Sequence, residues 1–388
     1  MKKILIVNNN LHIGGVQHAL VNLLHEIAVE PDLDITVLLF SRRGALMEQL
    51  PENVHVISPA VPFRCWGLVR GDKSTFFDKM LRAFFAVLTR LIGRSCALKF
   101  AYPFQKKLRG YDVAVSYLHC GGPKMFYGGC NEFVMQCVEA RKKITFMHCD
   151  YEKIGADCPA NTSLYDRFDV IAACSKGCRN SFLRVKPQFA AKTVVVQNCH
   201  DFARLATIPN LDNRTEHSPL RFITVARLGK EKGVVRAIRA ISDLGELAKK
   251  MHYDVFGNGS EFSDAQALIS LLGLESIVTL HGEQMEPYES MCFSDVLLIP
   301  SVSEAAPLVI GEAAALGVPI LTTETSSARE MVEQTGYGWV CDNSEAGLQQ
   351  GIKRLIRNPD VIVERALFLR SLTFNNDVAV QQFLDLLS

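Results

Sequence analysis

The sequence predicts an α/β protein made of two doubly wound parallel sheets. Short apolar strands alternate with helix-length amphipathic segments, the pattern of parallel sheets that are buried on both faces. The alternation stops in a polar stretch at residues 208–219 and then starts again. The chain of 388 residues is too long for one ordinary core, so two domains are expected.

The N-terminal half opens with the strand KILIVNN, the glycine turn HIGG and a helix over VQHALVNLLHEIA. Further strands are expected at DITVLLF, DVAVSYL, KITFMH and DVIAACS. The polar stretch IPNLDNRTEHSP is interpreted as a linker. The C-terminal half restarts with the strand RFITVARL and the helix GVVRAIRAISDLGEL, followed by strands at YDVF, SIVTLHG, DVLLIP and PILTT. The predicted domains are therefore 1–205 and 206–370.

Composition and charge exclude several classes of protein. Hydrophobic residues make up 48% of the chain and charged residues 21%, as in folded globular proteins. The net charge of +1 gives no basis for a nucleic-acid binder. The start MKKILIVNNN lacks the apolar core of a secretory signal, and no apolar run approaches the ~20 residues of a membrane-spanning helix. We therefore expect a cytoplasmic protein.

The twelve cysteines form no compact disulfide framework, and we expect reduced thiols. Five of them, together with two histidines, fall between residues 148 and 200. A zinc site there is the alternative, but paired CxxC spacing is missing. We predict buried core cysteines and no metal.

Residues 61–110 interrupt the alternation and carry eleven Lys and Arg against two Asp, a balance of +9. Within them, FFDKMLRAFFAVLTRLIGR places Lys79, Arg82, Arg90 and Arg94 on one arc of a helical wheel, with the apolar residues largely elsewhere. This pattern favours an interfacial helix on an anionic membrane surface. A surface helix whose apolar face packs on its own domain is the alternative.

Two glutamates lie on either side of an apolar run in SEAAPLVIGEAAALGVPILTT. Glu304 falls on a strand-to-helix loop, and Glu312 falls in the second turn of a helix that begins near Pro307. Parallel sheets bind ligands at the carboxyl edge where these residues lie. The amides of Leu308 and Val309 would face an anion at the helix start. A phosphate there, with a sugar on each side, would occupy both carboxylates.

The stretch ARLGKEKG follows the first strand of the C-terminal half and brings Arg227 and Lys232 to the same edge. Two cations there would neutralise a diphosphate leaving group without a metal ion. The turn GNG, with Gly257 and Asn258, allows a close approach of the backbone.

Together these motifs resemble the retaining GT-B glycosyltransferases of the family 4, or group 1, class, which includes bacterial exopolysaccharide, capsule and lipopolysaccharide sugar transferases. The family's E-x7-E motif matches Glu304 and Glu312, and its N-terminal glycine loop matches HIGG with Gly14 and Gly15. ARLGKEKG, YDVFGNG and VVVQNCHD match further family motifs in the same order along nearly the whole chain. Cys199 replaces the family's usual glycine, and SEAAPLVIGE has alanines where glycine and a bulkier apolar residue are common in the family, a departure that bears on the sugar pocket.

The resemblance implies two Rossmann-like domains that face each other across a cleft, the first binding the acceptor and the second the nucleotide sugar. It also implies that residues 371–388 form a helix that packs back on the N-terminal domain. The implied catalytic residues are Glu304, His119, Arg227 and Lys232, and the acceptor-side candidates are His148 and Asp150. The implied donor-binding residues are Gly14, Gly15, Arg227, Lys232, Gly257, Asn258, His281, Gly282, Glu304, Pro307, Leu308, Val309 and Glu312.

The implied function is a retaining, metal-independent transfer of sugar from a nucleotide sugar, with a UDP-sugar favoured, to a lipid-linked or polysaccharide acceptor. No cofactor is expected, and the expected place is the cytoplasmic face of the membrane. Three alternatives stay open: a soluble transferase acting on a small metabolite, a non-catalytic two-domain sugar-binding protein, and a metal-dependent transferase. The last would use the Asp32-x-Asp34 pair, which precedes a strand and so lies at its amino end.

Overall fold

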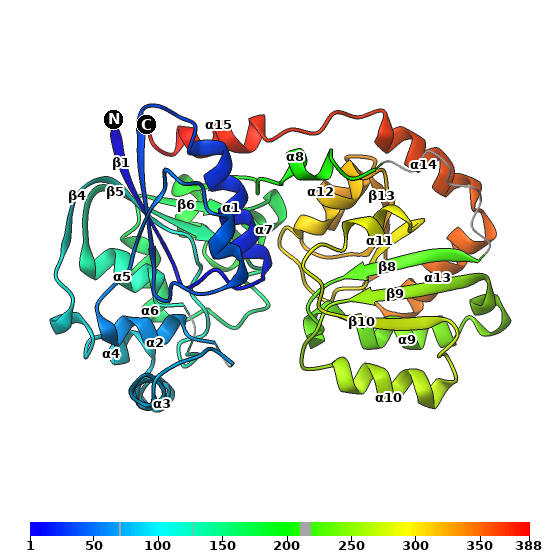
Figure 1. Ribbon diagram of the computed structural model, residues 1–388, viewed down its shortest axis with the longest axis horizontal. Helices are drawn as coiled ribbons and strands as arrows, with labels where there is room; N and C mark the ends of the chain where they lie inside the picture. The colour runs from blue at the N-terminus through cyan, green and yellow to red at the C-terminus, as the bar shows by residue number, and fades with distance from the viewer. Residues whose placement is uncertain (70, 127, 210–218) are drawn as a thin grey trace. The chain divides into compact units, whose positions relative to one another are not determined.

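The structure is a computed structural model that describes residues 1–69, 71–126, 128–209 and 219–388 (Figure 1). Its chain forms two compact units, one of residues 1–199 with 376–388 and the other of residues 200–375. The predicted boundary after residue 205 lies a short way inside the second unit. Most of the linker predicted at 208–219 lies outside the described residues.

The first unit is built on a seven-stranded sheet in the order β3-β2-β1-β4-β5-β6-β7. All neighbouring strands run parallel, as the alternation of strands and helices predicts. The strands are β1 (Lys2–Asn8), β2 (Leu33–Leu39), β3 (His55–Ile57), β4 (Leu108–Ser116), β5 (Val138–Met147), β6 (Val170–Ala173) and β7 (Thr193–Val195).

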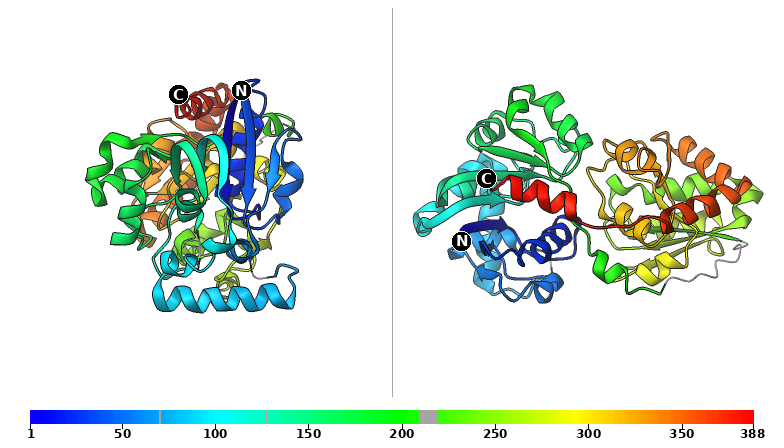
Figure 2. Two further views of the ribbon diagram at one scale, coloured as in Figure 1. Left: turned by 90° about the vertical axis from the view of Figure 1, so that its left-hand side faces the viewer. Right: turned by 90° about the horizontal axis from the view of Figure 1, so that it is seen from above.

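Helices connect and cover these strands (Figures 1 and 2). The helices of the first unit are α1 (Gly15–Ile27), α2 (Val61–Gly67), α3 (Phe76–Ile92), α4 (Arg94–Leu98), α5 (Cys130–Cys137), α6 (Pro159–Asp166), α7 (Lys176–Val185) and α15 (Asp377–Asp385). Helix α15 comes from the far end of the chain and is held here by several contacts, among them a hydrogen bond from the Gln197 amide to the Gln382 side chain at 2.9 Å. The Phe383 ring lies 6.3 Å from the ring of Phe146, and the Asn376 amide donates to Glu26 at 2.7 Å.

The second unit is built on a six-stranded parallel sheet in the order β10-β9-β8-β11-β12-β13. Its strands are β8 (Leu220–Val225), β9 (Met251–Phe256), β10 (Val278–Gly282), β11 (Val296–Ile299), β12 (Ile320–Thr323) and β13 (Gly338–Cys341). Its helices are α8 (Phe202–Leu205), α9 (Val234–Ser242), α10 (Phe262–Leu272), α11 (Tyr288–Cys292), α12 (Leu308–Ala315), α13 (Glu345–Arg357) and α14 (Asp360–Arg370).

Successive strand residues of this sheet enter two different cores, because side chains alternate between the faces of a strand. Phe222, Leu298 and Leu321 belong to one buried cluster, which includes side chains of α9, α10 and α13. Their chain neighbours Ile223 and Leu297 belong to a second cluster, which includes side chains of α11, α12 and α14. The sheet is therefore buried on both faces, which explains why its strands are almost continuously apolar.

The strand orders place one topological switch point in each sheet. In the first sheet β1 lies beside β4, and in the second β8 lies beside β11. Chains leave adjacent strands in opposite directions at such a point, and ligands bind at the crevice beyond the carboxyl ends. The segments that lie at these crevices are therefore those that follow β1 and β4 in one unit, and β8 and β11 in the other.

Helix α3 ends earlier than the predicted helix, and this corrects one of the residue assignments. Gly93 takes a left-handed φ of 84° and breaks the helix, and the chain then starts the separate helix α4 at Arg94. Arg94 is 1% exposed rather than on a surface arc, so it cannot contact a membrane. Among the described residues, no helix is long and apolar enough to cross a membrane.

Candidate functional site

The loop between β11 and α12 carries Glu304, whose carboxylate is already paired. The Lys232 ammonium lies 2.6 Å from Glu304 Oε1, and the Ser301 hydroxyl donates to the same oxygen at 2.7 Å. The two charged side chains are only 11% and 23% exposed, so this ion pair is better shielded than a surface pair. The switch point of the second sheet thus brings together the predicted residues Lys232 and Glu304. Lys232 has further N–H donors to offer an incoming anion.

Arg236 holds the start of this loop, a role that its sequence pattern does not reveal. Its guanidinium donates to the carbonyls of Pro300 and Ser301, each at 2.8 Å, and to the amide oxygen of Asn343 at 2.8 Å. Gly233 lets the two segments meet, because a Cβ there would lie 2.1 Å from the Pro300 carbonyl. The planar guanidinium fork thus fixes the backbone that presents Glu304.

Glu312 lies in the second turn of α12, in a setting that disfavours its charge. Burial, together with the nearby negative charge of Asp201, raises the pKa of Glu312 from 4.5 to about 7. Asp201 belongs to the chain segment that opens the second unit and caps α8. The ring of His200 lies against Gly311 and forms a hydrogen bond with the backbone of Leu308. His200 and Asp201 are the last two residues of the motif VVVQNCHD, but the motif alone predicts no role for either of them.

Helix α12 begins at Leu308, with Pro307 as its N-cap residue, one position later than predicted. It ends before Gly317, which has a φ of 71°. Leu308 is buried and Val309 is half-buried. The helix start therefore lies at the carboxyl edge of the sheet, where the helix dipole favours an anion.

Arg227 and the glycine turn at Gly257 lie at the same carboxyl edge of the second sheet, but their contacts differ. The Arg227 side chain is 75% exposed and pairs with Glu231 at 2.6 Å, so the structure does not bring it to Glu304. Gly257 has a φ of 139°, and a Cβ there would lie 1.8 Å from the Ala226 carbonyl. The close approach that this turn permits is therefore to the backbone after β8. Asn258 is exposed beside it.

His281 stands at the end of β10 and is fixed by two contacts. Its Nε2 lies 2.6 Å from Asp254 Oδ1, and its ring stacks on Phe256 at a centroid distance of 4.3 Å. Gly282 follows with a φ of 75°, and its carbonyl accepts a hydrogen bond from the Gly257 amide at 2.7 Å. The two predicted glycine positions of this edge thus support each other.

In the first unit, the predicted glycine loop follows β1. Gly14 is the N-cap residue of α1, and Gly15 opens the helix with open space around the position of a Cβ. The preceding asparagines are buried, and Asn10 donates to the Gly67 carbonyl at 2.8 Å. This loop lies at the switch point beside β4.

His119 and His148 follow the neighbouring strands β4 and β5 and are neutral at physiological pH. Burial, helped by the charge of Arg94, lowers the pKa of His119 to about 4. Burial, with His119 as a second cause, lowers the pKa of His148 to about 3. Asp150 is buried, and its carboxylate accepts a hydrogen bond from the Ser181 hydroxyl at 2.5 Å. The structure therefore groups the two histidines and turns Asp150 toward α7.

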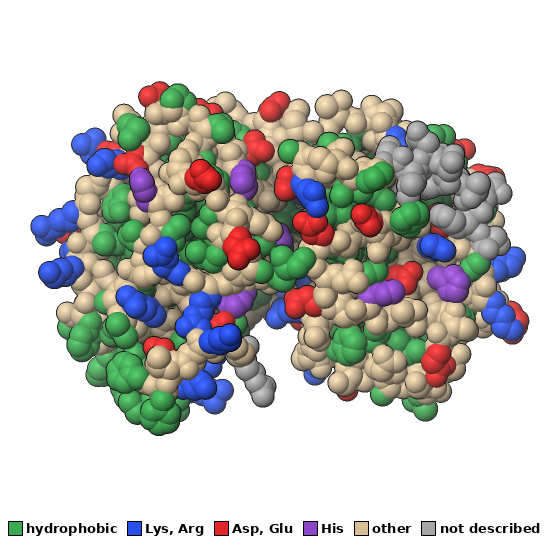
Figure 3. Space-filling view, in the orientation of Figure 1, with side chains coloured by type: hydrophobic (Ala, Val, Ile, Leu, Met, Phe, Trp, Pro, Cys, Tyr) green, Lys and Arg blue, Asp and Glu red, His purple; other side chains and the backbone are tan. Residues whose placement is uncertain are grey.

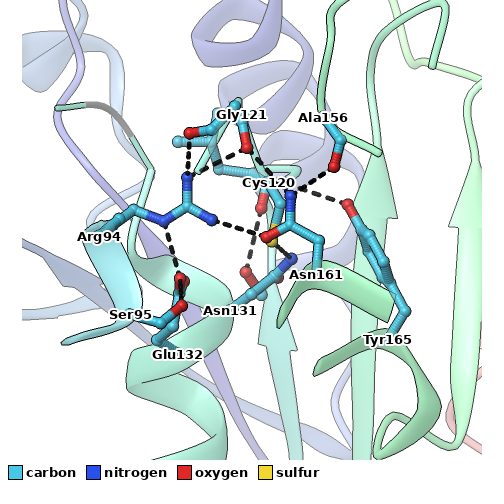
Figure 4. A network of polar contacts seen from close by, with 12 residues as sticks. Arg94, Ser95, Cys120, Gly121, Asn131, Glu132, Ala156, Asn161 and Tyr165 are labelled. Atoms are coloured by element: carbon cyan, nitrogen blue, oxygen red, sulfur yellow. Dashed lines mark hydrogen bonds and ion pairs between the residues drawn. The ribbon is translucent and has the colours of Figure 1, made fainter. Parts of the chain in front are cut away.

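Arg94 organises a buried polar network behind the His119 loop (Figure 4). Its Nε donates to Glu132 at 2.7 Å, and its Nη atoms donate to Asn161 and to the carbonyls of Gly121 and Gly122. A cation in this position is paired and hydrogen-bonded, as burial requires. Arg94 thus positions the chain that follows His119.

No group of three or more His, Cys, Asp or Glu side chains that could hold a metal ion occurs among the described residues. The cysteines are free thiols, most of them buried. The Cys178 thiol donates to the carbonyls of Met147 and Cys149, at 3.3 and 3.2 Å. These contacts are those of small core side chains.

Solved structures with the same arrangement define the class of fold. The chain aligns over 99% of its length with 99% of the Anabaena protein Alr3699/HepE, solved in complex with UDP and glucose, with a TM-score of 0.69 and 18% identity. It aligns over 100% of its length with 98% of the sucrose-phosphate synthase of Thermosynechococcus elongatus, with a TM-score of 0.70 and 15% identity. The fold is therefore GT-B, with two Rossmann-like domains.

The second unit contains a match to a family model. Residues 212–366 match the model of the family described as Glycosyl transferases group 1. The amylovoran biosynthesis glycosyltransferase AmsK of Erwinia amylovora is 30% identical over 44% of this chain and 45% of its own length. The N-acetyl-α-D-glucosaminyl L-malate synthase of Bacillus anthracis is 27% identical over 77% of this chain and 78% of its own length. The chain thus matches less than half the length of the Erwinia relative, and 34% of that of a second relative, from Escherichia coli.

Proposed function

We propose that this protein is a glycosyltransferase that moves a sugar from a nucleotide sugar, with a UDP-sugar as the first candidate, to a lipid-linked or polysaccharide acceptor. The observation that carries the proposal is the shielded pair of Lys232 and Glu304 at the switch point of the second sheet. The pair lies within the segment that matches the group 1 family. The amylovoran relative supports an acceptor in cell-surface polysaccharide synthesis.

In this proposal Lys232 binds the diphosphate of the donor, and Glu304 accepts hydrogen bonds from hydroxyls of the transferred sugar. The existing ion pair holds both groups in place before the donor arrives, which is preorganisation of the kind that favours the transition state. The exposed Arg227 side chain supplies the second cation by leaving its solvent-exposed partner Glu231, at little cost. Glu312 binds the ribose hydroxyls of the nucleotide.

The first unit is proposed to bind the acceptor. His119 and His148 are neutral, so each can donate from one ring nitrogen and accept at the other. A neutral imidazole can exchange hydrogen bonds with sugar hydroxyl groups, whereas it has no positive charge with which to attract an anion. We propose that both contact sugar hydroxyls. Asp150, which is held by Ser181, is a further candidate on the acceptor side.

Retention of configuration and independence of metal ions are part of the proposal. The cations Lys232 and Arg227 can stabilise the charge that develops on the leaving diphosphate, which is the usual task of a metal ion. Proton NMR of the product should show the donor's anomeric configuration, and full activity should persist in EDTA. An inverted product, or activity that returns only when a divalent ion is added, would contradict this part.

Thermal-shift measurements with UDP-, GDP- and ADP-sugars test the proposal directly, because a ligand that binds the folded state raises the melting temperature. We expect a shift with one of these donors. Glu312→Ala should chiefly reduce this shift, whereas Glu304→Ala should chiefly slow transfer. Glu275→Ala, an exposed carboxylate of the same unit, is the matched control and should change neither. Identical behaviour of the two site variants would refute the division of roles.

A second candidate is transfer to a small metabolite. It is favoured by the length of the match to the N-acetyl-α-D-glucosaminyl L-malate synthase of Bacillus anthracis, which covers most of both chains. With the donor known from the thermal shifts, L-malate and a polyprenyl-linked sugar can be compared as acceptors. Transfer to malate alone would replace the polysaccharide proposal.

A further inference from the structure

Helix α3 is shaped by local signals rather than by extensive packing. Thr75 and Asp78 form a capping box, in which each side chain accepts a hydrogen bond from the other's backbone amide at 3.1 Å. Gly93 ends the helix. The helix of 17 residues is about 25 Å long at ~1.5 Å per residue. It lies along one edge of the first unit (Figure 2).

The side of α3 that faces away from the unit is apolar. Only Phe85 and Thr89 of the helix are buried. Most of the exposed large hydrophobic residues recur every three or four positions and so share one face. These six are Phe76, Phe77, Met80, Phe84, Val87 and Leu91, of which Phe76 is 83% and Leu91 is 71% exposed; a seventh, Ile92 at the end of the helix, is 46% exposed and lies outside this face.

This exposed apolar face is the reverse of what a helix packed on its own domain would show. Amphipathic surface helices place their apolar stripe inward, and contiguous exposed apolar patches on proteins usually mark an interaction site. Figure 3 shows hydrophobic side chains gathered over α3, with Lys and Arg side chains beside them. The alternative that the apolar stripe packs on the first unit is therefore wrong for these six residues.

Cations border the apolar face. Lys79 follows Phe76 by three positions and Arg90 follows Val87 by three, so each neighbours the face on the helix surface. Both side chains are exposed. Arg82 differs, because its guanidinium lies 5.7 Å from the centre of the Phe126 ring within the unit.

We propose that the exposed apolar face of α3 inserts into the headgroup–acyl boundary of an anionic lipid membrane, with Lys79 and Arg90 on the lipid phosphates. The positive charge beside the apolar face favours a lipid surface over a second copy of the chain as its partner. A second copy of the chain would bring the same positive charges together, whereas an anionic lipid surface complements them. A helix that lies in the membrane plane needs no spanning length, only an apolar face with a cationic border.

Vesicle co-sedimentation of the full chain tests this inference without any assay of transferase activity. We expect binding to vesicles of equimolar phosphatidylcholine and phosphatidylglycerol, and much weaker binding to phosphatidylcholine alone. The triple variant Phe76→Ser, Phe84→Ser, Leu91→Ser should lose affinity by at least about tenfold, because each side chain leaves apolar surroundings. The double variant Lys79→Glu, Arg90→Glu should reduce only the additional vesicle binding that phosphatidylglycerol produces.

Two controls keep the result interpretable. The variant Leu271→Ser, Val363→Ser, Leu367→Ser removes three exposed apolar side chains from the other unit and should bind vesicles like the unaltered protein. Melting temperatures should be unchanged in all the variants, since the altered side chains are exposed. Binding that survives the α3 triple variant would overturn the proposal. So would sedimentation of the unaltered protein as a dimer that this variant converts to a monomer.

Discussion

Replacing Glu312 with glutamine should stabilise the protein above neutral pH and much less below pH 5. In the folded state the pKa of Glu312 is raised from 4.5 to about 7, first by burial and then by Asp201. Between these two values the folded state holds a proton that the unfolded state has released. The free energy of unfolding contributed by this group therefore falls as the pH rises through that window. Glutamine keeps the shape of the side chain and removes the titration.

The size of the effect follows from the two pKa values. A difference of one pKa unit corresponds to ~1.4 kcal/mol, so the rise from 4.5 to about 7 sets an upper limit of about 3 kcal/mol. The Glu312 side chain is not completely enclosed, and solvent screening lowers the penalty. We therefore expect Glu312→Gln to gain about 1–2 kcal/mol more at pH 8 than at pH 5.

The two tryptophans allow this to be measured in the unit that contains Glu312. Trp66 belongs to the first unit and Trp339 to the second. In a Trp66→Phe background, urea unfolding followed by fluorescence reports on Trp339 alone. Comparing the Glu312→Gln variant with its parent in this background cancels the titration of every other group. A stability difference that is the same at both pH values would refute the reasoning, because it would show that Glu312 is ionised at no extra cost.

Two further substitutions test the buried architecture. Arg94→Met should lower stability by about 3–5 kcal/mol, because it leaves the Glu132 carboxylate buried without its cation, whereas Arg90→Met on the exposed side should change the melting temperature little. Stability equal to that of Arg90→Met would contradict the network of Figure 4. Gly257→Ala should cost at least about 3 kcal/mol, from its positive φ and its contact with a carbonyl, while Gly273→Ala, which has a positive φ but open space, should cost about 1 kcal/mol in the same denaturation assay.

The parts of the fold that were predictable depend on short-range patterns. Continuous apolar runs identified the central strands of both sheets, since strands covered on both faces have no polar side to show. Pro307 and Gly317 bracketed α12 to within a residue or two, because each acts on the local backbone. The sequence also predicted that Lys232 and Glu304 share one edge of the sheet, since both come after strands that are adjacent at a switch point, but it did not predict their ion pair.

The parts that were missed depend on what surrounds a side chain in space. Arg236 resembles any cation on an amphipathic helix until the fold brings the carbonyl of Pro300 beside it. The raised pKa of Glu312 depends first on burial and then on Asp201, which is more than a hundred positions away in the sequence. Arg94 was assigned to the surface because the helical wheel was continued past Gly93. The glycine itself was the available signal, since a left-handed residue redirects every side chain that follows it.

The place of α15 has a consequence for the order in which the protein folds. The first unit consists of residues 1–199 and 376–388, so its last helix leaves the ribosome after the entire second unit. During synthesis, the surface around Phe146 that Phe383 later covers stays exposed while the 176 residues from 200 to 375 are made. The contiguous second unit can complete its own core first. Translation therefore closes the earlier half of the chain last, and a ribosome that stops before residue 376 leaves the first unit without the helix that finishes it.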